Sequence, residues 1–230
     1  MQTVLTLERL DKMKKLIIFA SLLTLMSGCG DKHYHSVVHV PTDPAPPVED
    51  ETIQELIDEE NEYRLGLGQT MLSQGLSCKL YTVTGGHRIQ STSGNILTLQ
   101  NKKQVATFLH SSEFNQEASS VNDGLNVLPE PLRGVFKNLY YLRCDGQIVI
   151  TETGHYSFEL NSDDASLLYI GGSLLIDNDN SHAPTVKTGQ KYLRKGVYTF
   201  RLDYAQTGSG QQALQLKMNN ELLNGTVLFH

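Results

Sequence analysis

The chain has 230 residues, a formal net charge of −6, 19% charged side chains and 7% aromatic side chains. This length suits one domain with attached segments. The charge is uneven, because residues 43–62 hold nine acidic and no basic side chains, whereas residues 76–230 hold thirteen of each sign. A neutral domain without basic clusters argues against nucleic acid as a partner.

The first 28 residues are typical of an export signal. Leu16–Met26 is an apolar run that is too short to span a bilayer comfortably, and small residues follow it. The run ends in Met-Ser-Gly-Cys29, which resembles the lipobox of bacterial lipoproteins. Cleavage before such a cysteine leaves it lipidated, so Cys29 is the expected membrane anchor. An ordinary secretory signal with an incidental cysteine is the alternative, and the start at Met1 or Met13 stays open.

Residues 29–48 are expected to form a lipidated tether. Four prolines make this segment stiff and extended. Its three histidines could bind a metal loosely, but a short histidine tract in a tether is usually incidental. Gly30 follows the cysteine in place of the Asp that retains some lipoproteins in the inner membrane. The expected location is therefore the bacterial cell envelope, with the outer membrane favoured.

Residues 49–74 are expected to form an acidic helix and a connector. Ile53, Leu56 and Ile57 recur near helical spacing, and the helix is predicted over residues 49–67. Acidic residues at its start suit the positive end of the helix dipole. The apolar stripe is narrow, so the helix should pack on the following domain or pair with a partner helix.

Short strands and turn signals alternate through residues 75–230, which is typical of an all-β antiparallel sandwich or barrel. Residues 111–128 are polar and are expected to form a long surface loop, and Asp145-Gly146 is a strong hairpin signal. The strands are predicted at residues 76–83, 96–99, 105–109, 139–143, 147–151, 155–161, 167–170, 174–176, 192–193, 197–204, 213–218 and 227–229.

Cys78 and Cys144 form an even pair in a chain that is expected to be exported. Each lies in or next to a predicted strand, so the two cysteines should form one disulfide between the first strand and a central one. Two free buried thiols are the alternative.

Residues 153–179 are the most informative stretch of the sequence. Tyr156, Phe158 and Leu160 alternate with polar residues, as expected of a strand with one buried face. The turn-forming residues 161–164 follow. After the next strand, Gly171-Gly172 can supply the positive φ angles of a tight hairpin.

This stretch resembles the PA-fourteen domain, the β-sandwich module first named from the protective antigen of anthrax toxin. The shared signature is Ser162-Asp163-Asp164, then a Leu-Tyr-Ile strand, a Gly turn and a strand ending in Ile-Asp-Asn. Ala165 departs from the Gly that the family usually has there. The resemblance covers about residues 75–230 and implies a β-sandwich.

The resemblance also implies a calcium site. In the flocculin-type lectins of this family, a paired-aspartate turn with a cis peptide bond holds calcium, and the metal binds vicinal sugar hydroxyls. Calcium takes six to eight oxygen ligands. The paired acids here are Asp163 and Asp164, and the loop at residues 205–212 would complete the cage. Its candidate binding residues are Gln206, Gly208, Gly210 and Gln211.

Other roles for these acids stay open. Asp163 and Asp164 could cap turn amides without any metal. Asp177 and Asp179 form a second oxygen-rich cluster, which is more typical of a polar hairpin end than of a calcium loop. His182 is expected to fill a turn.

The expected function is carbohydrate binding by an envelope lipoprotein, in adhesion or glycan recognition. The alternative is a non-catalytic structural or protein-interaction module, in which residues 111–128 and the acidic helix matter more. An enzyme is not expected, because no nucleophile elbow, triad or phosphate loop is recognisable. Neighbouring acids cannot flank a glycosidic bond as a glycosidase pair must.

Overall fold

The computed structural model describes residues 53–90, 98–119 and 123–230. The expected signal peptide, the tether and Cys29 lie outside the described residues, as do residues 96 and 97 of one expected strand. No helix within the described ranges is both long and apolar enough to cross a membrane.

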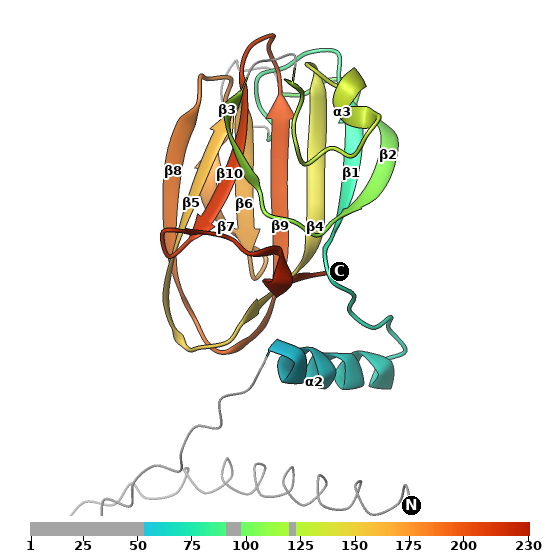
Figure 1. Cartoon of the computed structure of the whole chain (residues 1–230), viewed down its shortest axis with the longest axis vertical. Helices are drawn as coiled ribbons and strands as arrows, with labels where there is room; N and C mark the ends of the chain where they lie inside the picture. The colour runs from blue at the N-terminus through green and yellow to red at the C-terminus, as the bar shows by residue number, and fades with distance from the viewer. Residues whose placement is uncertain (1–52, 91–97, 120–122) are drawn as a thin grey trace, which may run out of the picture. The chain divides into compact units, whose positions relative to one another are not determined.

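Two antiparallel sheets form a β-sandwich, which confirms the predicted fold class (Figure 1). The strands are β1 (Leu76–Thr82), β2 (Lys103–His110), β3 (Asn115–Ser119), β4 (Tyr140–Ile150), β5 (Gly154–Asp163), β6 (Ala165–Ile170), β7 (Ser173–Asn178), β8 (Thr185–Leu193), β9 (Gly196–Gln206), β10 (Gln212–Met218), β11 (Glu221–Leu222) and β12 (Leu228–Phe229). The helices are α2 (Ile53–Gly66), α3 (Leu132–Val135) and the 3-10 turn η2 (Gly225–Val227).

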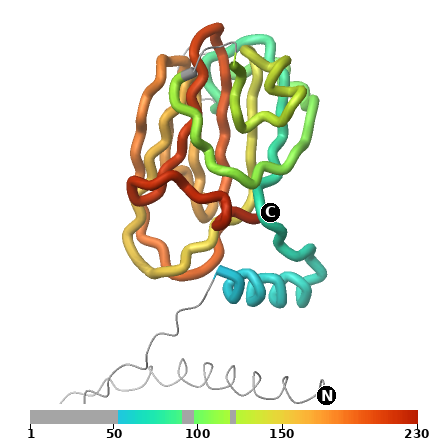
Figure 2. The backbone as a smooth tube through the Cα atoms, viewed as in Figure 1, coloured from blue at the N-terminus to red at the C-terminus, as the bar shows by residue number. Residues whose placement is uncertain are grey.

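The larger sheet has seven strands in the order β2-β1-β4-β9-β6-β7, with β12 beside β4. The smaller sheet has five strands in the order β11-β10-β5-β8, with β3 beside β10. Figure 2 shows how the chain crosses repeatedly between these two layers. Each sheet therefore combines strands that are far apart in the sequence.

The main core lies between the sheets. On β5, Phe158 is 1% exposed and Leu160 is fully buried, so the alternation read from the sequence is confirmed. Phe200 of β9 and Tyr140 of β4 belong to the same core cluster. Burial of such large side chains is the main stabilising term of the sandwich, at about 1.5–3 kcal/mol each.

Helix α2 packs on one end of the sandwich. Its Leu56 and Ile57 form an apolar cluster with Leu72 and with Val149 of β4. Asn61 accepts a hydrogen bond from the Leu72 main-chain nitrogen (2.5 Å), which closes the connector against the helix. These contacts confirm the predicted helix and its packing on the domain.

The disulfide between Cys78 and Cys144 is present, as predicted. The two residues lie directly opposite each other in the antiparallel register of β1 and β4. Both side chains are fully buried in the core between the sheets. Such a bond indicates a location outside the cytoplasm.

The hairpin predicted at Asp145-Gly146 is wrong, because β4 runs without interruption through both residues. A Cβ atom on Gly146 would lie 2.2 Å from the Phe229 carbonyl oxygen and 2.5 Å from Leu76 Cδ2. This glycine therefore permits the close approach of another main chain and does not form a turn.

The loop predicted at residues 111–128 is also partly wrong. It contains β3, which pairs with β10, and four of its side chains are buried in the core between the sheets. These side chains are Phe114, Leu125, Val127 and Leu128. They hold the polar segment against the sandwich, because the apolar area that they bury offsets the entropy lost on ordering.

The four-residue turn predicted at 161–164 is absent. Strand β5 continues to Asp163, β6 begins at Ala165, and the peptide bond between Asp163 and Asp164 is cis. The other predicted turn is confirmed, because Gly171 and Gly172 connect β6 to β7 with φ angles of 60° and 75°. Only glycine adopts two successive angles of this kind without steric cost.

Candidate functional site

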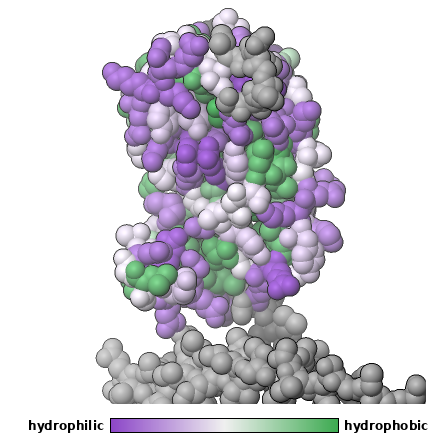
Figure 3. Space-filling view, turned by 180° about the vertical axis from the view of Figure 1, so that it is seen from behind, coloured by the Kyte–Doolittle hydropathy of each residue, from purple (hydrophilic) through white to green (hydrophobic). Residues whose placement is uncertain are grey.

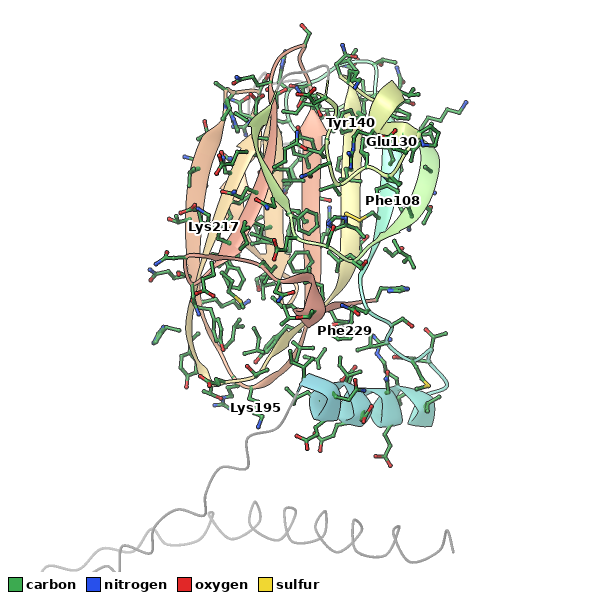
Figure 4. The ribbon with its side chains drawn as sticks, viewed as in Figure 1. Phe108, Glu130, Tyr140, Lys195, Lys217 and Phe229 are labelled. Carbon is green, nitrogen blue, oxygen red and sulfur yellow. A yellow bond between two sulfur atoms is a disulfide. The ribbon has the colours of Figure 1, made fainter. Side chains whose placement is uncertain are left out.

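The paired acids lie at the end of the sandwich opposite α2. In the β4–β9 pairing, Tyr140 faces Gln206 near the acids, and Val149 faces Val197 in the α2 cluster. Nine residues of strand separate these two positions, a distance of about 30 Å. Figure 1 shows α2 at the lower end of the domain and the loop between β9 and β10 at the upper end. Figure 4 labels Tyr140 near that upper end and Phe229 near the lower one.

A shallow pocket of about 310 Å³ opens at this rim. The predicted residues that line it are Asp163, Asp164, Gln206, Gly208 and Gly210. The structure thus brings the paired acids and the β9–β10 loop together, as the resemblance implies. Three further lining residues, Ser181, His182 and Ala183, come from the β7–β8 connection and were missed by the sequence analysis.

Asp164 ties two loops to the end of β5. Its Oδ2 accepts hydrogen bonds from the Thr207 nitrogen (2.8 Å), the Thr207 hydroxyl (3.0 Å) and the Gly208 nitrogen (3.0 Å). Its Oδ1 accepts from the Ser181 hydroxyl (3.1 Å) and the His182 nitrogen (3.0 Å). A carboxylate offers about four lone-pair positions, so these five donors saturate Asp164.

Asp163 is as buried as Asp164 and lines the same pocket, but it differs in its hydrogen bonding. Its side chain is only 7% exposed, lines the pocket and has no hydrogen-bond donor among the described residues. Burial, helped by the negative charge of Asp164, raises the pKa of Asp163 from 3.8 to about 6. An ionised carboxylate in this position is costly unless a ligand compensates it.

Gln206 closes the third side of the pocket. Its Oε1 accepts a hydrogen bond from the Tyr204 hydroxyl (2.5 Å), and its Nε2 donates to the carbonyl oxygens of Gly208 and Gln211 (3.2 Å each). The Tyr204 hydroxyl also contacts the Asp163 carbonyl oxygen. The predicted site residue Gln211 does not line the pocket: its side chain is exposed, and its carbonyl oxygen contacts only the Gln206 amide.

The second acidic cluster has a structural role. The buried Asp179 carboxylate accepts hydrogen bonds from the main-chain nitrogens of Ile89 (2.6 Å) and Gln90 (2.9 Å). Asp177 accepts one from the Asp179 nitrogen (3.0 Å). His182 fills a turn, as expected, with its ring nitrogens 2.9 Å and 3.1 Å from two carbonyl oxygens. Within the described ranges, no three His, Cys, Asp or Glu residues form a metal-binding group.

A calcium ion at the rim would therefore need the Asp163 carboxylate together with main-chain and amide oxygens. The free oxygens are those of Asp163, and the nearby carbonyls of Gly208 and Gln211 are held only by a neutral amide. These hard oxygen donors fit calcium, with water completing the six to eight ligands. Asp164 fits a different role, since its lone pairs already hold the two loops.

A larger pocket of about 580 Å³ lies on the seven-stranded sheet, beside Asp145, Tyr169 and Arg201. Arg201 pairs with Asp203 (2.6 Å), and Arg143 pairs with Asp145 (2.7 Å), so the charged groups there satisfy one another. Figure 3 shows the domain from behind, with hydrophilic and hydrophobic residues interspersed. This pocket offers less to a ligand than the rim, because it holds no comparable unpaired charge.

The fold and the rim pocket define the class of the domain as a β-sandwich module with a loop-built site at one end. Residues 130–225 match the family model of the PA14 domain, so this part of the chain is a PA14 domain. PA14 is the short form of PA-fourteen, the family that the sequence of residues 153–179 resembles. No curated protein matches the sequence.

Solved structures share the fold at low sequence identity. The PA14 domain of the antifreeze protein MpAFP is 16% identical, with a TM-score of 0.51 over 69% of this chain and 91% of its own. A PA14 sugar-binding domain from an RTX adhesin is 15% identical, with a TM-score of 0.50 over 68% and 98%. An anti-sigma factor domain-containing protein is 18% identical, with a TM-score of 0.50. The match spans 68% of this chain but only 47% of that protein.

Proposed function

We propose that the PA14 domain binds carbohydrate in the rim pocket, without catalysis, in adhesion or glycan recognition. The observation that carries this proposal is the Asp163 carboxylate, which lines the pocket, opens into it and accepts no hydrogen bond from the described residues. Sugar hydroxyls, directly or through a cation, supply the missing partners. The sugar-binding domain of the RTX adhesin, which has the same fold, supports the choice of ligand class.

Calcium is the proposed cofactor. Asp163 and the carbonyl oxygens of Gly208 and Gln211 would hold it, and the bound ion would supply a positive charge that attracts sugar hydroxyl oxygens. Asp164 keeps the loops at Ser181 and Thr207 in place around the site. Gly210 adds no side chain to the pocket wall, so a ring-shaped ligand can approach the main chain.

The proposed setting is the bacterial cell envelope. Lipidation of Cys29 would anchor the protein, with the outer membrane favoured, and the disulfide supports a position outside the cytoplasm. The rim pocket lies at the end of the domain opposite α2. Radiolabelled palmitate should label the wild-type chain and should not label Cys29→Ser; equal labelling of both would contradict the anchor.

The test of the binding site is Asp163→Asn, which preserves shape and removes the charge. In chelator at pH 7, this variant should melt at or above the temperature of the wild type. The folded-state pKa of Asp163 is raised, so the stability linked to its protonation is present below pH 4 and is lost as the pH rises through 6. In excess calcium the wild type alone should gain stability, by about 2–4 kcal/mol at 100–1,000 times the dissociation constant.

The same pair of proteins should be compared on a glycan array with calcium and with chelator. The wild type should bind, and Asp163→Asn should lose at least most of its signal. Glu117→Ala, an exposed acid on β3, is the matched control and should behave as the wild type does. If Asp163→Asn retains full glycan binding, the rim pocket is not the binding site.

A protein-interaction module is the second candidate function. Four large apolar side chains at the end of α2 and in the connector are more than half exposed, and a partner protein would cover them. They are Tyr63, Leu65, Leu67 and Met71. This role predicts that an envelope protein co-purifies with the wild type and is lost on replacing Leu65 and Leu67 by serine. Unchanged co-purification would dismiss it.

A further inference from the structure

We propose that the pocket on the seven-stranded sheet is a second saccharide site, which takes a linear, uncharged glycan lying across the strands and needs no metal ion. This inference goes beyond the proposed function, since none of the residues of this pocket lines the rim pocket. On β9, Arg201 of this pocket and Gln206 at the rim are five positions apart, a distance of about 17 Å. The two sites can therefore be tested independently.

The pocket is built on one row of residues that face one another across the sheet. Ser77 of β1 lies opposite Asp145 of β4, and Asp145 lies opposite Arg201 of β9. Arg201 in turn lies opposite Tyr169 of β6. All four residues line the pocket, and its volume of about 580 Å³ is typical of a small-molecule site. Neighbouring strands are about 4.8 Å apart, so a ligand that contacts the whole row lies across the strands over about 14 Å.

The charged side chains of the pocket are paired within the protein. Arg143 donates two hydrogen bonds to Asp145, at 2.7 Å and 2.8 Å. Arg201 pairs with the buried Asp203 (2.6 Å), and its guanidinium lies over the Tyr169 ring, 4.8 Å from the ring centroid. A charged ligand would have to displace one member of these pairs, which is costly, whereas a neutral ligand leaves them intact.

Three uncharged polar side chains of the pocket have no hydrogen-bond partner among the described residues. They are Ser77, Gln147 and Thr199. Ser77 and Gln147 are half-buried. The two hydroxyls and the amide can each donate and accept hydrogen bonds. The hydroxyl groups of a saccharide also donate and accept, so a sugar satisfies all three side chains.

A saccharide fits this face better than an extended peptide does. A peptide strand binds through main-chain hydrogen bonds at the edge of a sheet. Here β1, β4 and β9 lie side by side within the sheet, and their main-chain groups are already paired with one another (Figure 1). Only side chains are free to bind, and a ligand with hydroxyl groups along its whole length suits them. The paired charges also disfavour a nucleic acid strand, which needs unpaired basic groups.

The row of facing residues extends beyond the pocket at both ends. Leu109 of β2 lies opposite Ser77, and Leu174 of β7 lies opposite Tyr169. These leucines are 61% and 42% exposed. The C–H groups of a sugar ring can cover such side chains and remove apolar area from water. A glycan of several residues should therefore bind more tightly than a monosaccharide.

The test uses the full chain with Asp163→Asn, in chelator, so that the rim site is inactive. The probe is an array of gluco-, galacto- and chito-oligosaccharides, from monosaccharides to hexasaccharides. We expect binding to at least one series, with a signal that rises with chain length. The signal should be weaker than that of the wild type in calcium, because the sheet site holds no unpaired charge. Absence of binding to every series would overturn the inference.

Thr199→Trp in the same background should abolish this binding, because its indole fills the pocket from an exposed strand position. The matched control is Thr188→Trp, at an exposed position of β8 in the other sheet, and it should bind as the background does. Equal binding by the two tryptophan variants would overturn the inference, and their melting temperatures show whether both are folded. Gln147→Ala decides the matter if Thr199→Trp does not fold: it should weaken binding about fivefold through the loss of one hydrogen bond, and unchanged binding would contradict the site.

A nitrogen-15 NMR spectrum locates the bound oligosaccharide without a pocket variant. In chelator, the ligand should shift the side-chain amide signals of Gln147 and leave those of Gln206 unchanged; the reverse result would overturn the inference. Calcium-dependent glycan binding that Asp163→Asn abolishes, with none in chelator, would support the rim site and overturn the sheet site. Binding in chelator that Thr199→Trp abolishes, without any calcium-dependent binding, would support the sheet site and contradict the proposed function.

Discussion

Asp164→Ala is expected to lower the free energy of unfolding by about 3–5 kcal/mol. The change removes the acceptor of three main-chain N–H groups, those of His182, Thr207 and Gly208. A buried donor left without a partner costs about 1–3 kcal/mol. The Thr207 donor is buried and those of His182 and Gly208 are partly buried, so water recovers part of the sum. Urea denaturation followed by circular dichroism measures the loss as a lower midpoint at similar slope.

The contrast with Asp163 makes this prediction specific. Two neighbouring acids in one pocket should respond in opposite directions in chelator, with Asp164→Ala destabilising the fold and Asp163→Asn leaving it as stable or more so. Glu117→Ala serves again as the control on an exposed strand position. An Asp164→Ala midpoint equal to that of the control would show that the acid does not hold the two loops.

The double replacement of Cys78 and Cys144 by alanine is expected to cost about 4 kcal/mol. The bond closes a loop with a sequence separation of 66 residues, and the chain-entropy relation gives this value for a loop of that size. Both residues lie in the core between the sheets, so alanine adds no buried polar group.

Reduction provides an independent check of the same quantity. Dithiothreitol should lower the urea midpoint of the unfolding wild type toward that of the double variant and should leave the variant unchanged. If the double variant unfolds within about 1 kcal/mol of the oxidised wild type, the bond does not restrict the unfolded chain as the relation assumes.

The sheet architecture could be predicted because alternation is a local property. Phe158 and Leu160 face the core at every second position, and the Gly171-Gly172 turn is fixed by the two residues that form it. Gly146 shows the limit of local reading. A side chain is excluded at this position because the Phe229 carbonyl oxygen, 83 positions later, lies too close. The sequence alone shows only that a glycine is present.

The candidate site shows the same limit at the level of chemistry. The pairing of Asp163 with Asp164 is visible in the sequence, and the resemblance indicates which loop lies beside them. Which acid is free depends on donors from residues 181–182 and 207–208, and these are brought to Asp164 only by the folded loops. The sequence therefore indicated which residues meet at the rim, but it could not show that the donors of the two loops bind Asp164 and not Asp163.

Residues 73–75 and 228–230 lie side by side. Ser73 and His230 exchange a pair of main-chain hydrogen bonds of 3.0 Å and 2.8 Å, and the Gly75 nitrogen donates to the Leu228 carbonyl at 2.8 Å. Both segments thus lie on the side of the domain where α2 packs, about 30 Å of strand from the pocket. A module built in this way can be inserted into a loop of a host protein, or fused on that side, while the loops around the rim pocket remain unobstructed.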